Sequence, residues 1–178
     1  MNIHTIQSFI IKHSFRAVAV SVLLITGCAQ YQLTLNETVV REAQTLLTNF
    51  KTNDRNLRNC IDQHIKDKNI SNANQLTTLS CTHSGIKTLQ GLSLFRNLTH
   101  INLSHNQLTS ITELAKLGRV KVLLLNNNQL QAVPELLTLP ALEELNVLDN
   151  PNLRCEDLNQ LKNIFQGKMT AAQHCKPT

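Results

Sequence analysis

A pattern of apolar residues recurs at a constant interval through the middle of the chain, and it constrains the fold more than any other feature. Leu76, Leu98, Val120 and Leu142 open four successive units of equal length. Inside a unit, apolar residues follow three, five and ten positions later, and an asparagine stands at the eighth. A fixed period of this kind means that each unit is one structural repeat stacked on the next. The full sets are Leu98, Ile101, Leu103, Asn106 and Leu108; Val120, Leu123, Leu125, Asn128 and Leu130; and Leu142, Leu145, Val147, Asn150 and Leu153, the last delayed by one position after Pro151.

This spacing resembles the LxxLxLxxNxL signature of leucine-rich repeat proteins, and the short unit is similar to their bacterial, SDS22-like class. The resemblance covers residues 76 to 162. It implies an α/β fold, a solenoid with a short parallel β-sheet on its concave face. It also implies that Asn106, Asn128 and Asn150 hydrogen-bond the backbone inside the solenoid, with Ser84 at the matching place in the first unit.

The return side of each repeat has little room for a full helix at this period. We predict extended or 3-10 segments there, and Pro134 and Pro140 are consistent with both.

Segments without the repeat pattern precede the array and are expected to form a helical N-terminal cap over residues 36–75. Apolar residues at helical spacing predict a first helix over residues 37–50, with Asn36 as its N-cap. A second helix is expected over residues 54–66. Together they would cover apolar surface that the first repeat leaves open. The apolar face of the first helix would consist of Val39, Val40, Ala43, Leu46, Leu47 and Phe50.

Four repeats over residues 76–154 are followed by an expected C-terminal cap and tail over residues 155–178. Glu156 and Asp157 favour the start of a short helix, because acidic groups stabilise a helix N-terminus. Gly167 is suited to the end of that helix. We expect the final residues up to Thr178 to form a loose tail.

Residues 1–27 are expected to form a secretion signal. Lys12 and Arg16 provide a basic start, and residues 17–25 form an apolar run. This run is too short to span a bilayer, which needs about 20 residues.

The signal ends in Leu23-Leu24-Ile25-Thr26-Gly27-Cys28, which resembles the lipobox of bacterial lipoproteins. The resemblance implies a lipidated Cys28, a tether over residues 28–35, and a membrane contact through the acyl chains. Ala29 after the cysteine implies sorting to the outer membrane, and we expect the domain on its periplasmic side. The alternative is an ordinary secretion signal with an incidental cysteine.

Four cysteines remain after Cys28, and an even number in an exported protein suggests two disulfides. Of the three possible pairings we favour Cys60–Cys81 and Cys155–Cys175, because each would close one end of the array. Alternatively, Cys81 is a free buried residue in a leucine position, and Cys60 a small core residue.

The candidate binding surface consists of side chains that alternate with the inward leucines and so point away from the core. Val122, Leu124 and Leu148 are apolar where solvent is expected, and a contiguous apolar patch with a polar rim is typical of a protein contact. Chance is the alternative, since single apolar surface residues are common. The candidate residues are His100, Asn102, Ser104, Val122, Leu124, Asn126, Glu144, Asn146 and Leu148.

Composition and motifs argue against several other functions. Lys12 and Arg16 are the only charged groups of the signal segment, and the remaining basic and acidic groups are nearly balanced and unclustered, so nucleic-acid binding is not expected. We find no CxxC spacing, no histidine at ligand spacing from a cysteine, and no catalytic set, so we expect no metal, no cofactor and no enzyme.

The predicted function is a monomeric adaptor or scaffold that binds a protein in the cell envelope. Alternatives are a glycan- or peptidoglycan-binding lipoprotein and a surface factor that contacts host proteins.

Overall fold

The computed structural model describes residues 33–35, 38–41 and 45–175, in two compact units, Met1–Gln44 and Thr45–Thr178. The first unit contains an antiparallel pair of strands, β1 (Leu33–Leu35) and β2 (Thr38–Arg41). The expected signal segment, Cys28 and Asn36 lie outside the described residues. Within them, no helix is both long and apolar enough to cross a membrane.

The helix expected over residues 37–50 is wrong. Its first part is strand β2, where Thr38, Val39 and Val40 are β-branched and therefore favour extended backbone. Residues 45–50 have no regular secondary structure. Of the apolar residues at helical spacing, Leu46, Leu47 and Phe50 pack on the core without forming a helix.

Residues 45–53 belong to the second unit and pack on the rest of it as an irregular segment. The amide of Leu47 donates to the carbonyl of Ile70 at 2.9 Å. Phe50 is 1% exposed and meets Phe95 edge to face, with ring centroids 5.6 Å apart. Burying an aromatic ring in the first repeat stabilises this segment more than a solvated helix would.

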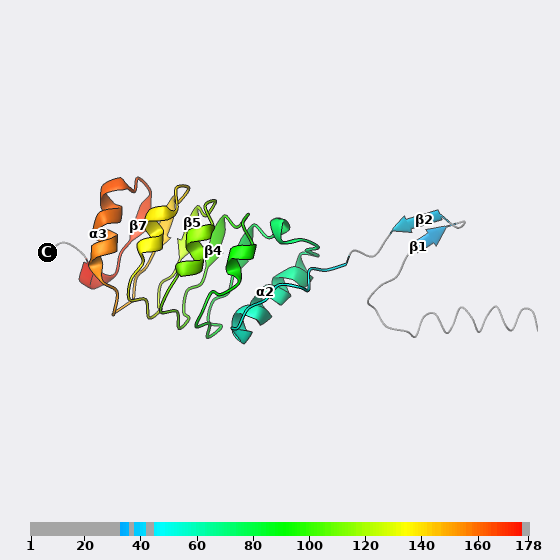
Figure 1. Ribbon diagram of the computed structural model, residues 1–178, viewed down its shortest axis with the longest axis horizontal. Helices are drawn as coiled ribbons and strands as arrows, with labels where there is room; N and C mark the ends of the chain where they lie inside the picture. The colour runs from blue at the N-terminus through cyan, green and yellow to red at the C-terminus, as the bar shows by residue number, and fades with distance from the viewer. Residues whose placement is uncertain (1–32, 36–37, 42–44, 176–178) are drawn as a thin grey trace, which may run out of the picture. The chain divides into compact units, whose positions relative to one another are not determined.

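The second unit is built on a five-stranded parallel sheet in the order β3-β4-β5-β6-β7 (Figure 1). The first four strands pair with an offset of one repeat, so that Thr78, His100, Val122 and Glu144 stand in one row. These segments lie side by side as the repeat period predicts. The strands are β3 (Thr78–Ser80), β4 (His100–Asn102), β5 (Val122–Leu124), β6 (Glu144–Asn146) and β7 (Lys168–Thr170).

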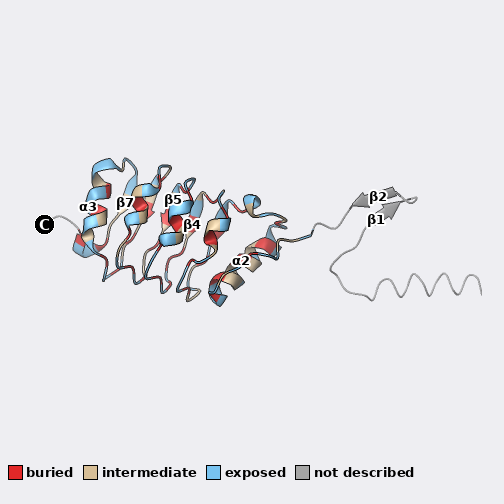
Figure 2. Cartoon of the chain, in the orientation of Figure 1, coloured by how far each residue is buried: buried red, intermediate tan, exposed pale blue. Residues whose placement is uncertain are grey.

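One continuous apolar core runs through the stack, and Figure 2 shows its buried residues along the inside of every coil. The middle residue of each of the first four strands points inward and is at most 2% exposed. Because neighbouring coils supply the same position, each inward side chain packs on its equivalent above and below. These four residues are Leu79, Ile101, Leu123 and Leu145.

The return side consists of short 3-10 helices, as predicted. Pro134 opens one of them at a position where its missing N–H would have no helical partner. The return elements are η2 (Leu92–Leu94), η3 (Thr112–Lys116) and η4 (Pro134–Thr138), and a further 3-10 turn, η1 (Ala73–Gln75), precedes the first repeat.

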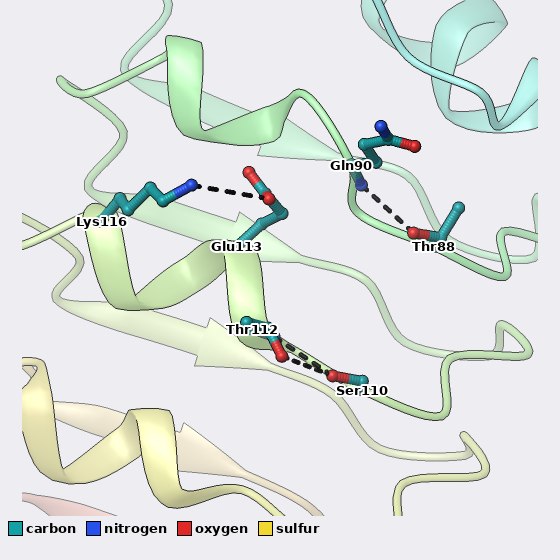
Figure 3. A network of polar contacts seen from close by, with 6 residues as sticks. All are labelled: Thr88, Gln90, Ser110, Thr112, Glu113 and Lys116. Carbon is teal, nitrogen blue, oxygen red and sulfur yellow. Dashed lines mark hydrogen bonds and ion pairs between the residues drawn. The ribbon is translucent and has the colours of Figure 1, made fainter.

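The residue at the start of each return segment either has a hydrogen-bond partner for its backbone amide or has no N–H group. The Thr88 hydroxyl accepts from the amide of Gln90, and the Ser110 hydroxyl accepts from the amide of Thr112, both at 3.3 Å (Figure 3). One repeat later, Ala132 has no hydroxyl, and Pro134 has no N–H that would need one. The repeat that lacks the hydroxyl therefore also lacks the N–H group that the hydroxyl would pair with.

A ladder of buried asparagines connects the coils where the chain leaves each strand, as the resemblance implied. Asn128 donates to the carbonyls of Leu103 and Leu125 at 3.0 and 2.9 Å, and it accepts from the amide of Leu108 at 3.0 Å. Asn106 and Asn150 make equivalent bonds to their own and the preceding coil. Each side chain therefore satisfies backbone groups of two repeats at once.

Helix α2 (Arg55–Asp67) lies along the free edge of β3. A stripe at four-residue spacing reaches the first repeat: Asn56 donates to the Gly85 carbonyl, His64 Nε2 lies 3.1 Å from the Ser80 carbonyl, and Lys68, just past the helix, donates to Thr78. Side chains thus occupy backbone groups that a further strand would otherwise pair.

Asp54 fixes the beginning of α2 to the first repeat. One carboxylate oxygen accepts from the amides of Asn56 and Leu57, and the other from those of Lys87 and Thr88. Burial raises the pKa of this carboxyl, but the four backbone hydrogen bonds outweigh burial and hold its pKa below the ordinary value.

The C-terminal segment contains more structure than expected. Helix α3 (Cys155–Ile164) forms where the acidic residues predicted it. Strand β7 then extends the sheet and η5 (Gln173–Cys175) follows it, neither of which the sequence predicted. Residues 176–178, where the loose tail is expected, lie outside the described residues. Gly167 does not end the helix; it lies against the Glu143 carbonyl, where a Cβ atom would clash.

We expect Asn128→Asp to lower the free energy of unfolding by at least about 2 kcal/mol, because two buried carbonyls lose their donor. Urea unfolding followed by circular dichroism measures the change. Gln129→Glu makes the same chemical substitution at an exposed neighbour and should leave stability nearly unchanged. Equal stability of the two variants would contradict the ladder's role.

Asp54→Asn should destabilise the protein at pH 7 by about 1–2 kcal/mol. Because the folded-state pKa is lowered, the carboxylate stabilises the fold above the unfolded value of about 3.9, and this contribution is lost as pH falls through the folded pKa. The stability difference from the unaltered protein should therefore shrink below pH 4. Urea titrations at several pH values test this, with the exposed Asp149→Asn as control.

Candidate functional site

The outward side chains of the five strands form two parallel rows, which together with the residues just after the strands we call the sheet face. The first row contains His100, Val122 and Glu144, and the second contains Asn102, Leu124 and Asn146. Ser104, Asn126 and Leu148 follow the strands at matching positions. The structure thus brings all nine predicted residues onto one surface. Thr78, Ser80, Lys168 and Thr170 extend its rows to either side.

An apolar centre lies on β5, the middle strand of the sheet. Val122 and Leu124 are half-buried rather than fully exposed, and Leu148 is half-buried as well. Leu124 stands in register with Asn102 on one side and Asn146 on the other. A central apolar group between polar neighbours has the arrangement of core and rim that protein interfaces show.

Two asparagines beside this centre are held with their amide oxygens inward. The Asn102 oxygen accepts from the amide of Ser104 at 3.1 Å, and the Asn146 oxygen accepts from the amide of Leu148 at 3.0 Å. Their NH₂ groups make no hydrogen bond within residues 45–175. Leu124 is therefore flanked by two oriented hydrogen-bond donors, which suit carbonyl or hydroxyl acceptors of a partner.

Ser104 contributes little to the accessible surface. It is 5% exposed, and its hydroxyl lies 2.7 Å from the Asn102 oxygen and 2.6 Å from the Asn126 oxygen. Its role in this structure is to connect the polar side chains of adjacent repeats. The sequence pattern predicted the face on which Ser104 lies, but it did not predict that Ser104 is buried there.

Charge on the sheet face is paired across strands. Lys168 Nζ lies 2.7 Å from a Glu144 oxygen, and Lys121 Nζ lies 2.7 Å from a Glu143 oxygen at the beginning of the rows. Exposed pairs like these contribute only about 0–1 kcal/mol each. Their consequence is that no single sign of charge dominates, so shape and hydrogen bonding determine what fits.

One margin of the sheet face carries a row of residues in left-handed backbone conformation. His83, His105, Asn127 and Asp149 have φ between 50° and 57°, one in each repeat. The rings of His83 and His105 stack with centroids 4.1 Å apart. The row therefore places one polar side chain at the equivalent position of each of the four repeats.

The cysteines pair as the sequence analysis favoured. Cys60 is bonded to Cys81, with Cα atoms 5.9 Å apart, and Cys155 to Cys175, with Cα atoms 5.2 Å apart. The first bond joins α2 to the first repeat, and the second joins the start of α3 to η5.

Each disulfide has a histidine beside it, which the sequence analysis missed. His64 and His174 place a ring nitrogen within 4.8 Å of the sulfurs of their respective pairs. The signal for His64 was its position one helical turn after Cys60, which puts both on one face of a helix. His174 gave no such signal, because only the fold brings Cys155 to it.

No family model matches the chain, and no curated protein matches it. Among solved structures it is similar to an internalin (inlF) from Listeria monocytogenes, with a TM-score of 0.58 and 21% identity over 67% of this chain. The fold of this chain is therefore that of a leucine-rich repeat protein. The chain spans 36% of that internalin's length. An internalin C2 (inlC2) of the same organism matches with 20% identity over 66% of this chain and 93% of its own, at a TM-score of 0.24 that supports no argument.

Proposed function

We propose that this protein is a protein-binding module of the bacterial cell envelope, held to a membrane by lipid on Cys28. The apolar centre of the sheet face, at Val122 and Leu124, is the observation that carries the proposal. It belongs to the middle strand, so a partner that covers it also meets polar side chains on both neighbouring strands. Residues that dominate binding energy are typically central and surrounded by a polar rim.

In this proposal the sheet face is the concave binding surface, and α2 and α3 are caps that close the ends of the stack. The protein acts as an adaptor or scaffold, as a monomer and without catalysis. The surface of five short strands suits an interface of under about 800 Å² per partner, which is small. Attachment of both molecules to one membrane raises their effective concentration and offsets a weak contact.

Glycan or peptidoglycan binding is the second candidate, because the NH₂ groups of Asn102 and Asn146 suit sugar hydroxyls. The rows of the sheet face contain no Phe, Tyr or Trp, which sugar sites commonly use as a platform. Pull-down with purified cell-wall fragments distinguishes the two candidates. A third candidate, contact with host proteins, requires exposure on the cell surface, which protease treatment of intact cells tests.

Val122→Asp combined with Leu124→Asp should weaken partner binding at least tenfold, about 1.4 kcal/mol, because buried carboxylates replace the apolar centre. A photo-crosslinking residue at position 146 in intact envelopes provides the measurement, with bands quantified in both backgrounds. Leu94→Asp is the matched control, since Leu94 is 45% exposed and lies on the return side. Undiminished cross-linking by the double variant, with its circular dichroism unchanged, would contradict the proposed surface.

Cys28→Ser should release the protein from the membrane fraction, because the acyl chains that hold it would be absent. Fractionation of cells and mass measurement of the processed N-terminus test this. If the variant still sediments with membranes after a carbonate wash, lipid on Cys28 is not the anchor. Separation of inner from outer membranes tests the proposed outer-membrane location, and protease treatment of intact cells tests the proposed periplasmic side.

A further inference from the structure

Both ends of the repeat stack carry the same chemical group, a pair of cysteines with a histidine nitrogen within 4.8 Å of the sulfurs. The two groups arise from different local structures. At the first end, Cys60 and His64 lie one turn apart on α2, and Cys81 follows β3. At the other end, His174 and Cys175 are adjacent in η5.

The first group is open to solvent on one side. Cys60 and His64 are half-buried and line a groove of about 400 Å³ beside α2, whereas Cys81 is 1% exposed. Asp67 also lines the groove. A small ion or a dithiol can therefore reach Cys60 and His64 without opening the core.

The ring of His64 is fixed in place. Its Nε2 lies 3.1 Å from the carbonyl oxygen and 3.3 Å from the amide nitrogen of Ser80, the residue directly before Cys81. In metal-binding histidines the ring nitrogen that does not bind the metal usually has a partner of this kind, which orients the ring and leaves the other nitrogen, here Nδ1, as the ligand atom.

We propose that Cys60, His64 and Cys81 form a zinc site whenever the disulfide between the two cysteines is reduced. A dithiol reductant gives two electrons and two protons to the S–S bond, becomes a disulfide itself, and leaves two thiols. Zn²⁺ then replaces both thiol protons, which are released to solvent, and accepts the neutral imidazole of His64 as third ligand. Water from the groove takes the fourth position.

Two thiolates and an imidazole are a donor set that selects zinc over harder ions. Zinc needs ligand distances of about 2.3 Å to sulfur and about 2.0–2.1 Å to nitrogen, which donor atoms already within 4.8 Å of one another meet after small side-chain rotations. The metal would join α2 to the first repeat as the disulfide does. The oxidised and zinc-bound states thus close the same end of the stack by different bonds.

The second group is less suited to a cation. Lys162 Nζ donates to the carbonyl oxygen of Cys175 at 3.0 Å, which places a positive charge at the backbone of that cysteine. We therefore assign the zinc site to the first group alone.

The experiment uses the full chain with Cys155→Ser and Cys175→Ser, which removes the second pair of thiols. The protein is reduced by a phosphine, freed of reductant without oxygen, and titrated with Co²⁺ and then Zn²⁺. We expect one Co²⁺ per chain with thiolate charge-transfer and tetrahedral absorption bands, displacement of Co²⁺ by Zn²⁺, and release of about two protons per zinc at a pH below the thiol pKa of about 8.5. The oxidised protein should show no such bands.

His64→Gln in the same background should lower zinc affinity at least tenfold, because one of three ligands is lost. His100→Gln is the matched control, because His100 is an exposed histidine on the neighbouring strand β4, in regular strand conformation. Circular dichroism monitors folding, and if the reduced chain unfolds, recovery of the native spectrum on zinc addition supports the proposal. Absence of tetrahedral bands, equal affinity of the two histidine variants, or failure of zinc to restore a lost fold would overturn it.

Discussion

The register between coils is the constraint on which the rest of this structure depends. Strands offset by one repeat length place each inward leucine on its equivalent, and buried asparagines connect successive coils at the point where the chain turns. Backbone amides and carbonyls in a buried bend need partners, and a side chain with one acceptor and two donor hydrogens supplies them for two coils together. Coils of equal length keep both sets of contacts aligned along the array.

Register also determines what the protein can bind. Because the strands align, residues at the same position of successive repeats lie in a straight row. The apolar pair on β5, Val122 and Leu124, therefore lies at the centre of a surface, with Asn102 and Asn146 beside it. The proposed binding surface is thus assembled from positions that the core leaves unused. Its chemistry is set repeat by repeat, while its geometry is fixed by the coil length.

The parts of the fold that depend on periodic burial were predictable from sequence: the parallel strands, the asparagine ladder, the 3-10 return segments, α2 and α3. The structure of residues 37–50 was not predictable. Apolar residues at helical spacing can also reach the core from a segment without a helix, as Phe50 does. Strand β7 was missed because it follows β6 at a longer interval than the repeat period and has Met169 in place of leucine. For the candidate site, the pattern gave the face, whereas the burial of Ser104 and the position of His64 required the fold.

The row of left-handed residues limits how this surface can diversify. His83, His105, Asn127 and Asp149 occupy a backbone region that β-branched side chains avoid, so valine, isoleucine and threonine are unfavourable along that margin. New ligand preferences can therefore arise by exchanging strand residues freely, but this border retains short or planar polar groups. In relatives that share the coil geometry, we expect the residue types to vary in the middle of the sheet face and to remain similar along this margin.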